Sequence, residues 1–361
     1  MSAVAVVANG SKESAAGVRA ARIGAALDDF DVELVFREGS RLADARRFAA
    51  AAHRAAVVYA VDLAGAPLLG ARFRSHSAKL VIDTGDAPSA FFQVVSAPHS
   101  KVVAARLMER YAYRAASAFV VRGAYHPRYL REQGFHKDVH VVPDGIDLDA
   151  FRTVDDDGLR EQLDLTDAFT VGIQGHFTWY PQLGGGLGWE LLHAISLRPD
   201  IPMHAVLIGD GRGIPELCRL AGELGISDRL HVMGRVPYGS LARYLAMCDV
   251  CLLTQTNDPS SWVRTTGKLP VYLAAGRYVL ATRVGTAVDV LPGEMLLDYD
   301  GAWDHAYPGR LADAIARVAH DPDRAKKGWA LRGEAKRFDY AIVAAEAAAV
   351  VRGALVRGAV G

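Results

Sequence analysis

Two cations flank a short polar turn in the second half of the chain. The turn comprises Arg264, Thr265, Thr266, Gly267 and Lys268. We expect Thr266 to cap the helix that follows, because a threonine hydroxyl can accept a hydrogen bond from a first-turn N–H group. Cations are unfavourable at a helix N-terminus unless an anion is shared. The turn therefore predicts a site for a diphosphate, and an ordinary surface helix with a basic first turn is the alternative.

Three loops in the same half follow predicted strands and can add contacts to a ligand. One of them combines pliable backbone with a guanidinium and comprises Gly209, Asp210, Gly211 and Arg212. A second loop, 234–238, contains Val236. A third, 175–180, contains His176, which is either a hydrogen-bonding residue of a cleft or a turn residue. Each loop alone fits a tight turn, but the carboxyl ends of parallel strands share one edge of a sheet, so we expect the loops to converge.

The first half of the chain has polar residues at the ends of its own predicted strands. Asn9 and Gly10 follow a strand at the N-terminus, and Asp83 and Asp86 end another. Ligands of open α/β sheets bind beyond the carboxyl ends of strands, so these four residues are candidate ligand contacts. The Asn9-Gly10 turn lacks a full G-x-G-x-x-G pattern, and Asp83 can instead cap the following turn. We take Asp86 and His176 as the candidate catalytic residues, as positioning groups that can assist proton transfer.

Strand and helix patterns alternate along the whole chain. The predicted strands of the first half are 3–8, 32–36, 56–61, 79–83, 118–122 and 139–142. Those of the second half are 169–174, 204–209, 230–233, 249–254, 278–282 and 294–297. This alternation predicts the α/β class with two doubly wound parallel sheets, each in a Rossmann-like domain. We place the domains at 1–150 and 151–335, and expect a C-terminal helix within 336–361 to pack on a domain surface.

Composition and charge limit the classes of partner. The 361 residues are 51% apolar with a formal net charge of zero, so no overall attraction to nucleic acid or to an anionic membrane is expected. Arg106, Arg110 and Arg114 form a basic stripe on a predicted helix. Three charges are fewer than the ~4 to 8 of typical lipid-binding clusters, which favours a solvated face over contact with a membrane or a phosphorylated acceptor.

The three cysteines, Cys218, Cys248 and Cys251, are too few for a disulfide framework. Cys248 and Cys251 form a C-x-x-C pair without a second ligand pair, so we expect buried thiols and no zinc. The first ten residues lack a basic signal-peptide region, which together with the cysteine count predicts a cytoplasmic protein. A composition rich in alanine, arginine and glycine suggests a GC-rich bacterial source.

Three motifs, in their order along the chain, resemble those of retaining nucleotide-sugar glycosyltransferases. The group is the one related to glycogen and sucrose-phosphate synthases, which has two facing Rossmann-like domains, the GT-B architecture. The motifs are residues 141–151 (VVPDGIDLDAF), 205–211 (AVLIGDG) and 268–276 (KLPVYLAAG). The resemblance implies a donor domain in the second half and an acceptor domain in the first. It implies a nucleoside-diphosphate sugar as donor, a small-molecule or glycan acceptor, no further cofactor, and retention with the leaving phosphate taking the acceptor proton.

The chain departs from this group at two places. Val263 and Val271 stand where the group carries a pair of Glu residues, the second of which typically holds the donor ribose. The Arg and Lys that usually grip the diphosphate are absent from 175–188, which reads GHFTWYPQLGGGLG. Arg264 and Lys268 can replace their charge, because a departing diphosphate needs cationic stabilisation. A sugar-nucleotide epimerase and a non-catalytic binding protein with the same fold are the alternative hypotheses.

Overall fold

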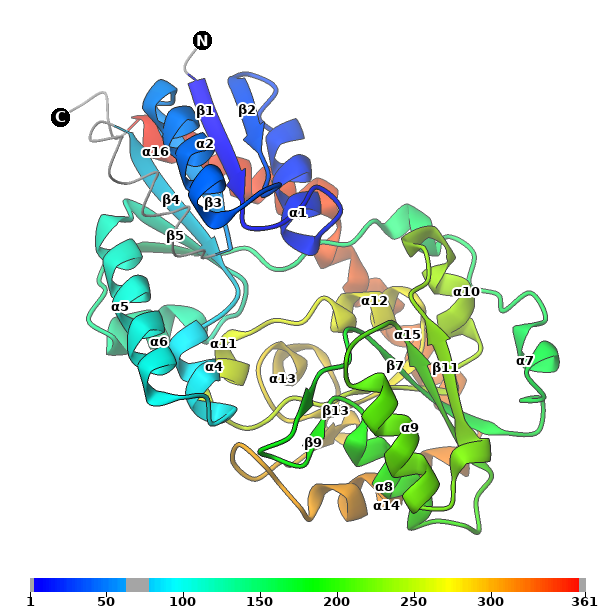
Figure 1. The fold of residues 1–361 in the computed structure, drawn as a ribbon. Coiled ribbons are helices and arrows are strands. Elements are labelled where there is room, and N and C mark those ends of the chain that lie inside the picture. Colours follow the sequence, from blue (N-terminus) through cyan, green and yellow to red (C-terminus); the bar gives the residue numbers. More distant parts are fainter. Residues whose placement is uncertain (1–2, 63–77, 357–361) are drawn as a thin grey trace. The chain divides into compact units, whose positions relative to one another are not determined.

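The computed structural model describes residues 3–62 and 78–356 (Figure 1). The chain forms two compact units, each built on a six-stranded parallel sheet. The first unit comprises Met1–Gly145, Pro259–Thr265 and Phe338–Gly361, and the second comprises Ile146–Asp258 and Thr266–Arg337. The α/β fold class with two parallel sheets is confirmed.

The sheet of the first unit has the order β2-β1-β3-β4-β5-β6. Its strands are β1 (Ala3–Ala8), β2 (Asp31–Val35), β3 (Val57–Val61), β4 (Lys79–Thr84), β5 (Ala118–Val121) and β6 (Asp138–Val141). Its helices are α1 (Ala15–Ala25), α2 (Arg41–Arg54), α4 (Pro88–Val94), α5 (His99–Ala115), α6 (His126–Glu132), α11 (Pro259–Val263) and α16 (Tyr340–Val356).

Helices cover both faces of this first sheet, which is why its strands are nearly continuous apolar runs. Alternate residues of β1 belong to opposite core layers, because successive side chains of a strand point to opposite faces. Val4 and Val6 pack with α1 and with Val343 and Val351 of α16, whereas Ala5 packs with residues of α2 and α5. The C-terminal helix therefore completes the core of the first unit.

The sheet of the second unit has the order β11-β10-β7-β12-β13-β14. Its strands are β7 (Phe169–Gln174), β10 (Met203–Ile208), β11 (Leu230–Gly234), β12 (Val250–Leu253), β13 (Tyr278–Thr282) and β14 (Leu296–Leu297). Its helices are α7 (Leu159–Gln162), α8 (Trp189–Ser196), α9 (Ile214–Glu223), α10 (Leu241–Ala246), α12 (Lys268–Ala274), α13 (Thr286–Val290), α14 (Tyr307–Ala319) and α15 (Arg324–Ala330). Short 3₁₀ helices lie at Leu148–Phe151, Ser227–Arg229, Tyr238–Ser240, Gly293–Met295 and Leu331–Phe338.

Two local predictions for this second half were wrong, and one small element was not predicted. The helix expected to be capped by Thr266 begins at Lys268, with Gly267 at the capping position and no side-chain capping bond. The first two residues of the strand expected at 294–297 lie in a 3₁₀ turn, and its last two residues pair with β13. A small antiparallel pair, β8 (Trp179–Tyr180) and β9 (Gly185–Gly186), was not expected.

The compact units also differ from the sequence-based boundaries at α11. The segment 259–265, which we placed in the second domain, groups with the first unit. The segment groups with the first unit because its Val263 is fully buried against Ala87 and Tyr129 of that unit. The chain thus leaves the second unit after β12, contributes one short helix to the first, and returns just before α12.

Candidate functional site

Loops at the carboxyl edge of the second sheet pack tightly on one another. After β10, Gly209 and Gly211 have φ values of +141° and +148°, a region that side chains disfavour. A Cβ on Gly209 would lie 1.9 Å from the carbonyl oxygen of Gly175, and one on Gly211 would lie 2.1 Å from that of Phe177. The N–H of Phe177 donates to the carbonyl of Asp210 at 2.8 Å. The loops after β7 and β10 are therefore joined, and only glycine permits this approach.

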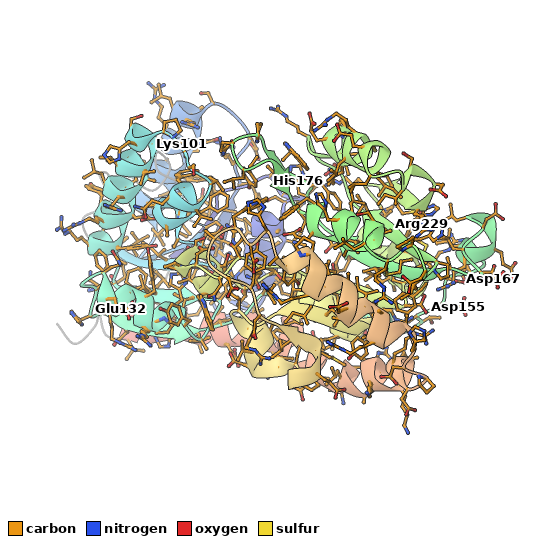
Figure 2. The ribbon with its side chains drawn as sticks, turned by 90° about the horizontal axis from the view of Figure 1, so that it is seen from below. Lys101, Glu132, Asp155, Asp167, His176 and Arg229 are labelled. Carbon is orange, nitrogen blue, oxygen red and sulfur yellow. The ribbon has the colours of Figure 1, made fainter. Side chains whose placement is uncertain are left out.

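His176 and Asp210 are brought together by this packing. The imidazole Nδ1 lies 3.2 Å from Asp210 Oδ1, and the two side chains are 69% and 56% exposed (Figure 2). Both groups can thus reach solvent or a ligand. A carboxylate at this position selects the ring orientation of the histidine and leaves its second nitrogen for another partner.

Lys268 lies beside the same loop. The nearest atoms to a Cβ built on Gly175 are Lys268 Cε at 2.8 Å and Nζ at 3.2 Å. Helix α12 is fixed there because the N–H of Gln174 donates to the hydroxyl oxygen of Tyr272 at 2.8 Å. The ammonium of Lys268 is therefore held at the carboxyl end of β7, as the sequence interpretation of this turn requires.

The remaining predicted residues of the second unit lie around these loops. Arg212 is exposed, Val236 is half-buried, and the loop that contains Val236 is tied to β10 because the N–H of Gly209 donates to the Gly234 carbonyl. The hydroxyl of Thr266 is buried and, among the described residues, has no hydrogen-bond partner. The loops therefore converge in the structure as predicted from the strand pattern.

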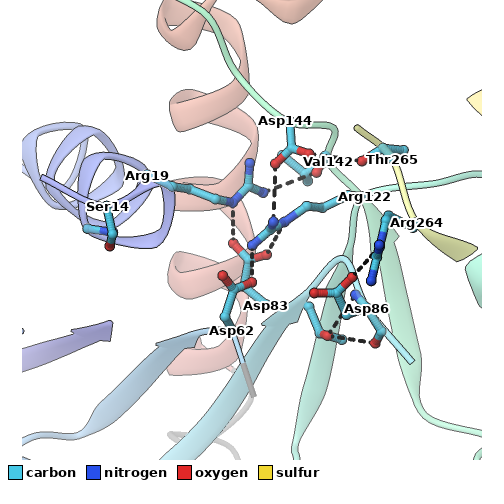
Figure 3. Close-up of polar contacts among 12 residues, drawn as sticks. Ser14, Arg19, Asp62, Asp83, Asp86, Arg122, Val142, Asp144, Arg264 and Thr265 are labelled. Carbon is cyan, nitrogen blue, oxygen red and sulfur yellow. Dashed lines mark hydrogen bonds and ion pairs between the residues drawn. The ribbon is translucent and has the colours of Figure 1, made fainter. Parts of the chain in front are cut away.

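Asp83 belongs to the interior of the first unit and is not a surface residue. Its side chain is fully buried and accepts a hydrogen bond from Arg19 Nε at 2.6 Å (Figure 3). It also accepts one from the Tyr59 hydroxyl at 2.8 Å. Arg19 also donates to the carbonyls of Val142 and Pro143. The expectation that Asp83 contacts a ligand was wrong, because its carboxylate is buried and paired with the Arg19 guanidinium.

Asp86 is half-exposed and forms an ion pair with Arg264. Arg264 Nε donates to Asp86 Oδ1 at 2.7 Å, and its guanidinium lies 5.0 Å from the centre of the Phe91 ring (Figure 3). Next to it, the hydroxyl of Thr265 donates to Asp144 at 3.1 Å. Arg264 and Thr265 thus belong to the first unit and contact its residues, whereas Thr266 to Lys268 belong to the second. The predicted turn is therefore divided between the two units, with Arg264 paired to Asp86.

Arg122 is a polar residue of this first site that the sequence interpretation missed. Its guanidinium pairs with Asp62, lies 3.3 Å from Asp144 Oδ1 and 3.5 Å from Asp83 Oδ1, and is largely buried (Figure 3). Burial raises the pKa of Asp62 to about 6, opposed by Arg122. Asp62 directly follows β3 and Arg122 directly follows β5, so the strand-end rule applied to Asp83 could have found both residues.

Asn9 and Gly10 stand at the end of β1, where the sequence placed them. Both are half-buried, and the N–H of Asn9 donates to the Val61 carbonyl at 3.0 Å. Ser14 begins the following helix α1 and accepts from the N–H of Gly17. This turn lies beside the end of β3, which Asp62 follows. Its sequence lacks the glycine pattern of phosphate-binding loops.

Val263 and Val271 are core residues in the structure. Val263 has no exposed surface and Val271 is 5% exposed. The two positions where the resembled group carries carboxylates are therefore occupied by packed apolar side chains.

A pocket of about 360 Å³ opens at the other edge of the second sheet. It is lined by residues that include Arg160, Phe169, Asp249 and Arg324. Arg160 donates to the Ala168 and Met247 carbonyls and to Asp249, and Arg324 contacts Asp249 and the Phe169 ring. Because these cations bind the protein itself, the pocket is a weaker candidate than the loops at the carboxyl edge.

Comparison with known protein families matches a segment that contains the loop after β10 and helix α12. Residues 185–321 match the family model described as Glycosyl transferases group 1, which covers less than half of the chain. No protein of curated function is detectably similar in sequence. Among the described residues, we find no helix with the length and apolar character that crossing a membrane requires.

Solved structures of low sequence identity share the fold over nearly the whole chain. HepE of Anabaena in complex with UDP-glucose superposes with a TM-score of 0.76 at 19% identity, covering 98% of this chain and 100% of that chain. Sucrose-phosphate synthase from Thermosynechococcus elongatus has a TM-score of 0.76 at 18% identity, with coverages of 99% and 100%. A glycosyltransferase from Rickettsia africae has a TM-score of 0.69 at 13% identity, with coverages of 98% and 98%. The fold of this chain is the GT-B type, with two Rossmann-like α/β units.

Proposed function

We propose that the protein is a glycosyltransferase that moves a sugar from a nucleoside diphosphate to a hydroxyl-bearing acceptor with retention of configuration. The observation that supports this most is the convergence of Lys268 with the loops after β7 and β10. The GT-B fold and the family match at 185–321 support the reaction class. The fold alone hosts several functions, so the proposal rests on this site.

The second unit is the donor side of this proposal. The diphosphate lies against Lys268, Thr266 and Gly267, where a cation and the buried hydroxyl of Thr266 meet backbone N–H groups. Gly209 to Arg212 and Val236 contact the nucleoside and the sugar. Lys268 then supplies the positive charge that a departing nucleoside diphosphate needs.

The first unit is the acceptor side. Asp86 accepts from an acceptor hydroxyl through the carboxylate oxygen that Arg264 does not occupy, and Arg264 fixes the orientation of the carboxylate. Asn9 and Gly10 line the same strand ends. Asp62 joins them as a carboxylate whose pKa, raised to about 6 by burial, allows it to exchange a proton near neutral pH.

The proposed reaction breaks the bond between the anomeric carbon and the leaving phosphate oxygen. The acceptor oxygen forms the new bond on the same face of the sugar, and its proton passes to the departing phosphate. Asp86 and His176 position the reacting groups in this scheme, and no cofactor besides the nucleotide sugar is needed. The anomeric configuration of the product, measured by proton NMR, tests retention directly.

Incubation with UDP- and GDP-sugars separates the transferase from its alternatives. With an acceptor mixture, the proposal predicts a new glycoside and free nucleoside diphosphate. Formation of an epimeric sugar nucleotide without any acceptor would instead establish an epimerase. Binding of a sugar nucleotide without turnover, whichever acceptor is present, would favour a binding protein. The absence of both expected carboxylates, replaced by Val263 and Val271, is consistent with that outcome.

A further inference from the structure

Helix α5 exposes apolar and basic side chains on one face. Leu107 is 63% exposed, and Val103 and Tyr111 are 38% and 37% exposed. The basic side chains exposed on this face are those of Arg106, Arg110 and Arg114. Lys101, labelled in Figure 2, lies about 160° around the helix from Val103, with its ammonium over the Phe92 ring.

The two kinds of side chain alternate around the same arc. At about 100° per residue, Arg110 and Arg114 lie within roughly 20° of Val103, and Leu107 lies at about 40°. Tyr111 and Arg106 border this arc on its two sides. Each leucine or valine is therefore next to a guanidinium, whose aliphatic part can cover it while the charge points outward.

The opposite side of α5 anchors the helix to the first unit. Val102, Ala112 and Tyr113 are buried, the last two in the core under β4 and β5. Glu109, the one carboxylate of α5, is buried too, and accepts from the N–H and the hydroxyl of Ser89. The outward face consequently has no negative charge of its own.

The arginines of this face also lack carboxylate partners from elsewhere. In residues 3–62 and 78–356, no Asp or Glu oxygen lies within 4.0 Å of Arg106, Arg110 or Arg114. Four other surface arginines of the first unit are paired: Arg47 with Glu38, Arg54 with Glu33, Arg128 with Glu132, and Arg352 with Asp29. In a chain of zero formal charge, this is a local excess of positive charge beside exposed apolar side chains.

We propose that this face of α5 docks on an anionic lipid bilayer. Phosphate headgroups supply the negative charge that the protein does not, and the interfacial region accepts Leu107, Val103 and the amphipathic ring of Tyr111. A nucleic acid or another hydrophilic polyanion would satisfy the arginines but leave the apolar side chains in water. The sequence alone favoured a solvated face for these three arginines, and the exposed Leu107, Val103 and Tyr111 beside them are the observation that supports docking.

Vesicles test this inference independently of any enzymatic activity. The protein is sedimented with vesicles of phosphatidylcholine alone and with vesicles of equal parts phosphatidylcholine and phosphatidylglycerol. We expect binding to the anionic vesicles only, decreasing as salt is added, because each arginine interacts with the surface potential. Failure of the wild-type protein to bind the anionic vesicles would overturn the proposal and leave the face to a protein partner.

A variant with Arg106→Gln, Leu107→Ser and Arg110→Gln should bind these vesicles more than about twenty-fivefold more weakly, because each of the two arginines contributes about fivefold near an anionic surface and the leucine adds to the loss. Helix α2 offers a matched control with Arg41→Gln, Leu42→Ser and Arg46→Gln. Leu42 is also 63% exposed, and the two variants lose the same charge. The control should bind as the wild type does. Equal loss in both variants, or no loss in the α5 variant, would contradict docking through α5, and circular dichroism checks that both remain folded.

Discussion

Lys268 is the residue on which donor binding depends most in this account. Its ammonium lies at the carboxyl end of β7, where the resembled group places its own cations. A charge-assisted contact in a closed site contributes ~1.5 to 3 kcal/mol, so Lys268→Ala should weaken nucleoside diphosphate binding by roughly ten- to a hundredfold. Calorimetric titration measures this. Lys268→Gln should behave like the alanine variant, and binding of the bare nucleoside should change little.

A stable Lys268→Ala protein that binds the diphosphate as the wild type does would remove the anion site from the proposal. Thermal unfolding of the variant distinguishes this outcome from a damaged fold. Arg264→Ala is the matched comparison, because Arg264 is a neighbouring cation that the structure assigns to the first unit and to Asp86. We expect it to leave nucleotide affinity within about twofold of the wild type, since its charge is shared with Asp86 and not with Lys268.

Asp86→Ala should lower turnover while leaving nucleoside diphosphate affinity nearly unchanged. The reason is that Asp86 contacts Arg264 and lies in the first unit, apart from the loops that we assign to the donor. Steady-state rates and calorimetry are measured on the single variants and on the double variant with Arg264→Ala. If the pair acts together, the double variant should lose little more activity than Asp86→Ala alone. A parallel fall in donor affinity would show that our allocation of substrates to units is wrong.

Glu190 gives the stability of the protein a pH dependence. The side chain is 5% exposed, and burial raises its pKa to about 8 from the ordinary value of 4.5. Between these values the folded protein holds a proton that the unfolded chain has released, so stability falls as pH rises through this window. For one proton the slope is ~1.4 kcal/mol per pH unit.

Urea unfolding of the wild type and of Glu190→Gln at several pH values between about 5 and 8 checks this prediction. The variant cannot titrate at position 190, so the free energy difference between the two proteins isolates this group. Contributions of opposite sign, such as that of His126, whose pKa burial lowers to about 4, cancel in the difference. Parallel stability curves for the two proteins would mean that Glu190 is ionised in the folded state.

At the scale of elements, the donor loops depend on two glycines. Gly209→Ala should displace the loop after β10, because its Cβ would meet the carbonyl oxygen of Gly175 at 1.9 Å and its φ is +141°. Strain of this kind costs ~1 to 3 kcal/mol, so nucleoside diphosphate affinity should fall roughly tenfold or more. Gly239→Ala, where no atom lies within 4 Å of the new Cβ, should bind as the wild type does. Equal affinities in both variants would argue against a ligand at this loop.

Most elements were predictable because buried parallel strands have a strong sequence pattern. The bounds of β1, β7 and β13 agree with the predicted strands to the residue, since each is an apolar run bounded by turn residues. The start of α12 was not predictable from capping propensity, because the chain at 264–266 has no regular secondary structure and Thr265 is bound to Asp144. The β8–β9 pair has two residues per strand, too short for any periodicity.

At the scale of the whole molecule, the features that were not predicted depend on contacts between residues far apart in the sequence. The excursion of α11 into the first unit follows from the burial of Val263, and the role of Asp83 follows from Arg19, a residue 64 positions away. Neither partner has a local signal. The residues of the donor loops could be predicted, because the order of the strands brings these loops together. The prediction for Asp83 failed, because its burial depends on an arginine far away in the sequence.

The central claim is that the second unit binds a nucleoside diphosphate, and one titration tests it most directly. The wild-type protein is titrated calorimetrically with UDP, GDP, ADP, CDP and TDP, and with the nucleoside of whichever binds best. The account predicts saturable binding of at least one diphosphate at a single site, with the nucleoside binding much more weakly because Lys268 contacts the phosphates. Absence of measurable binding to every diphosphate would contradict the account and favour a protein that kept the fold without its donor.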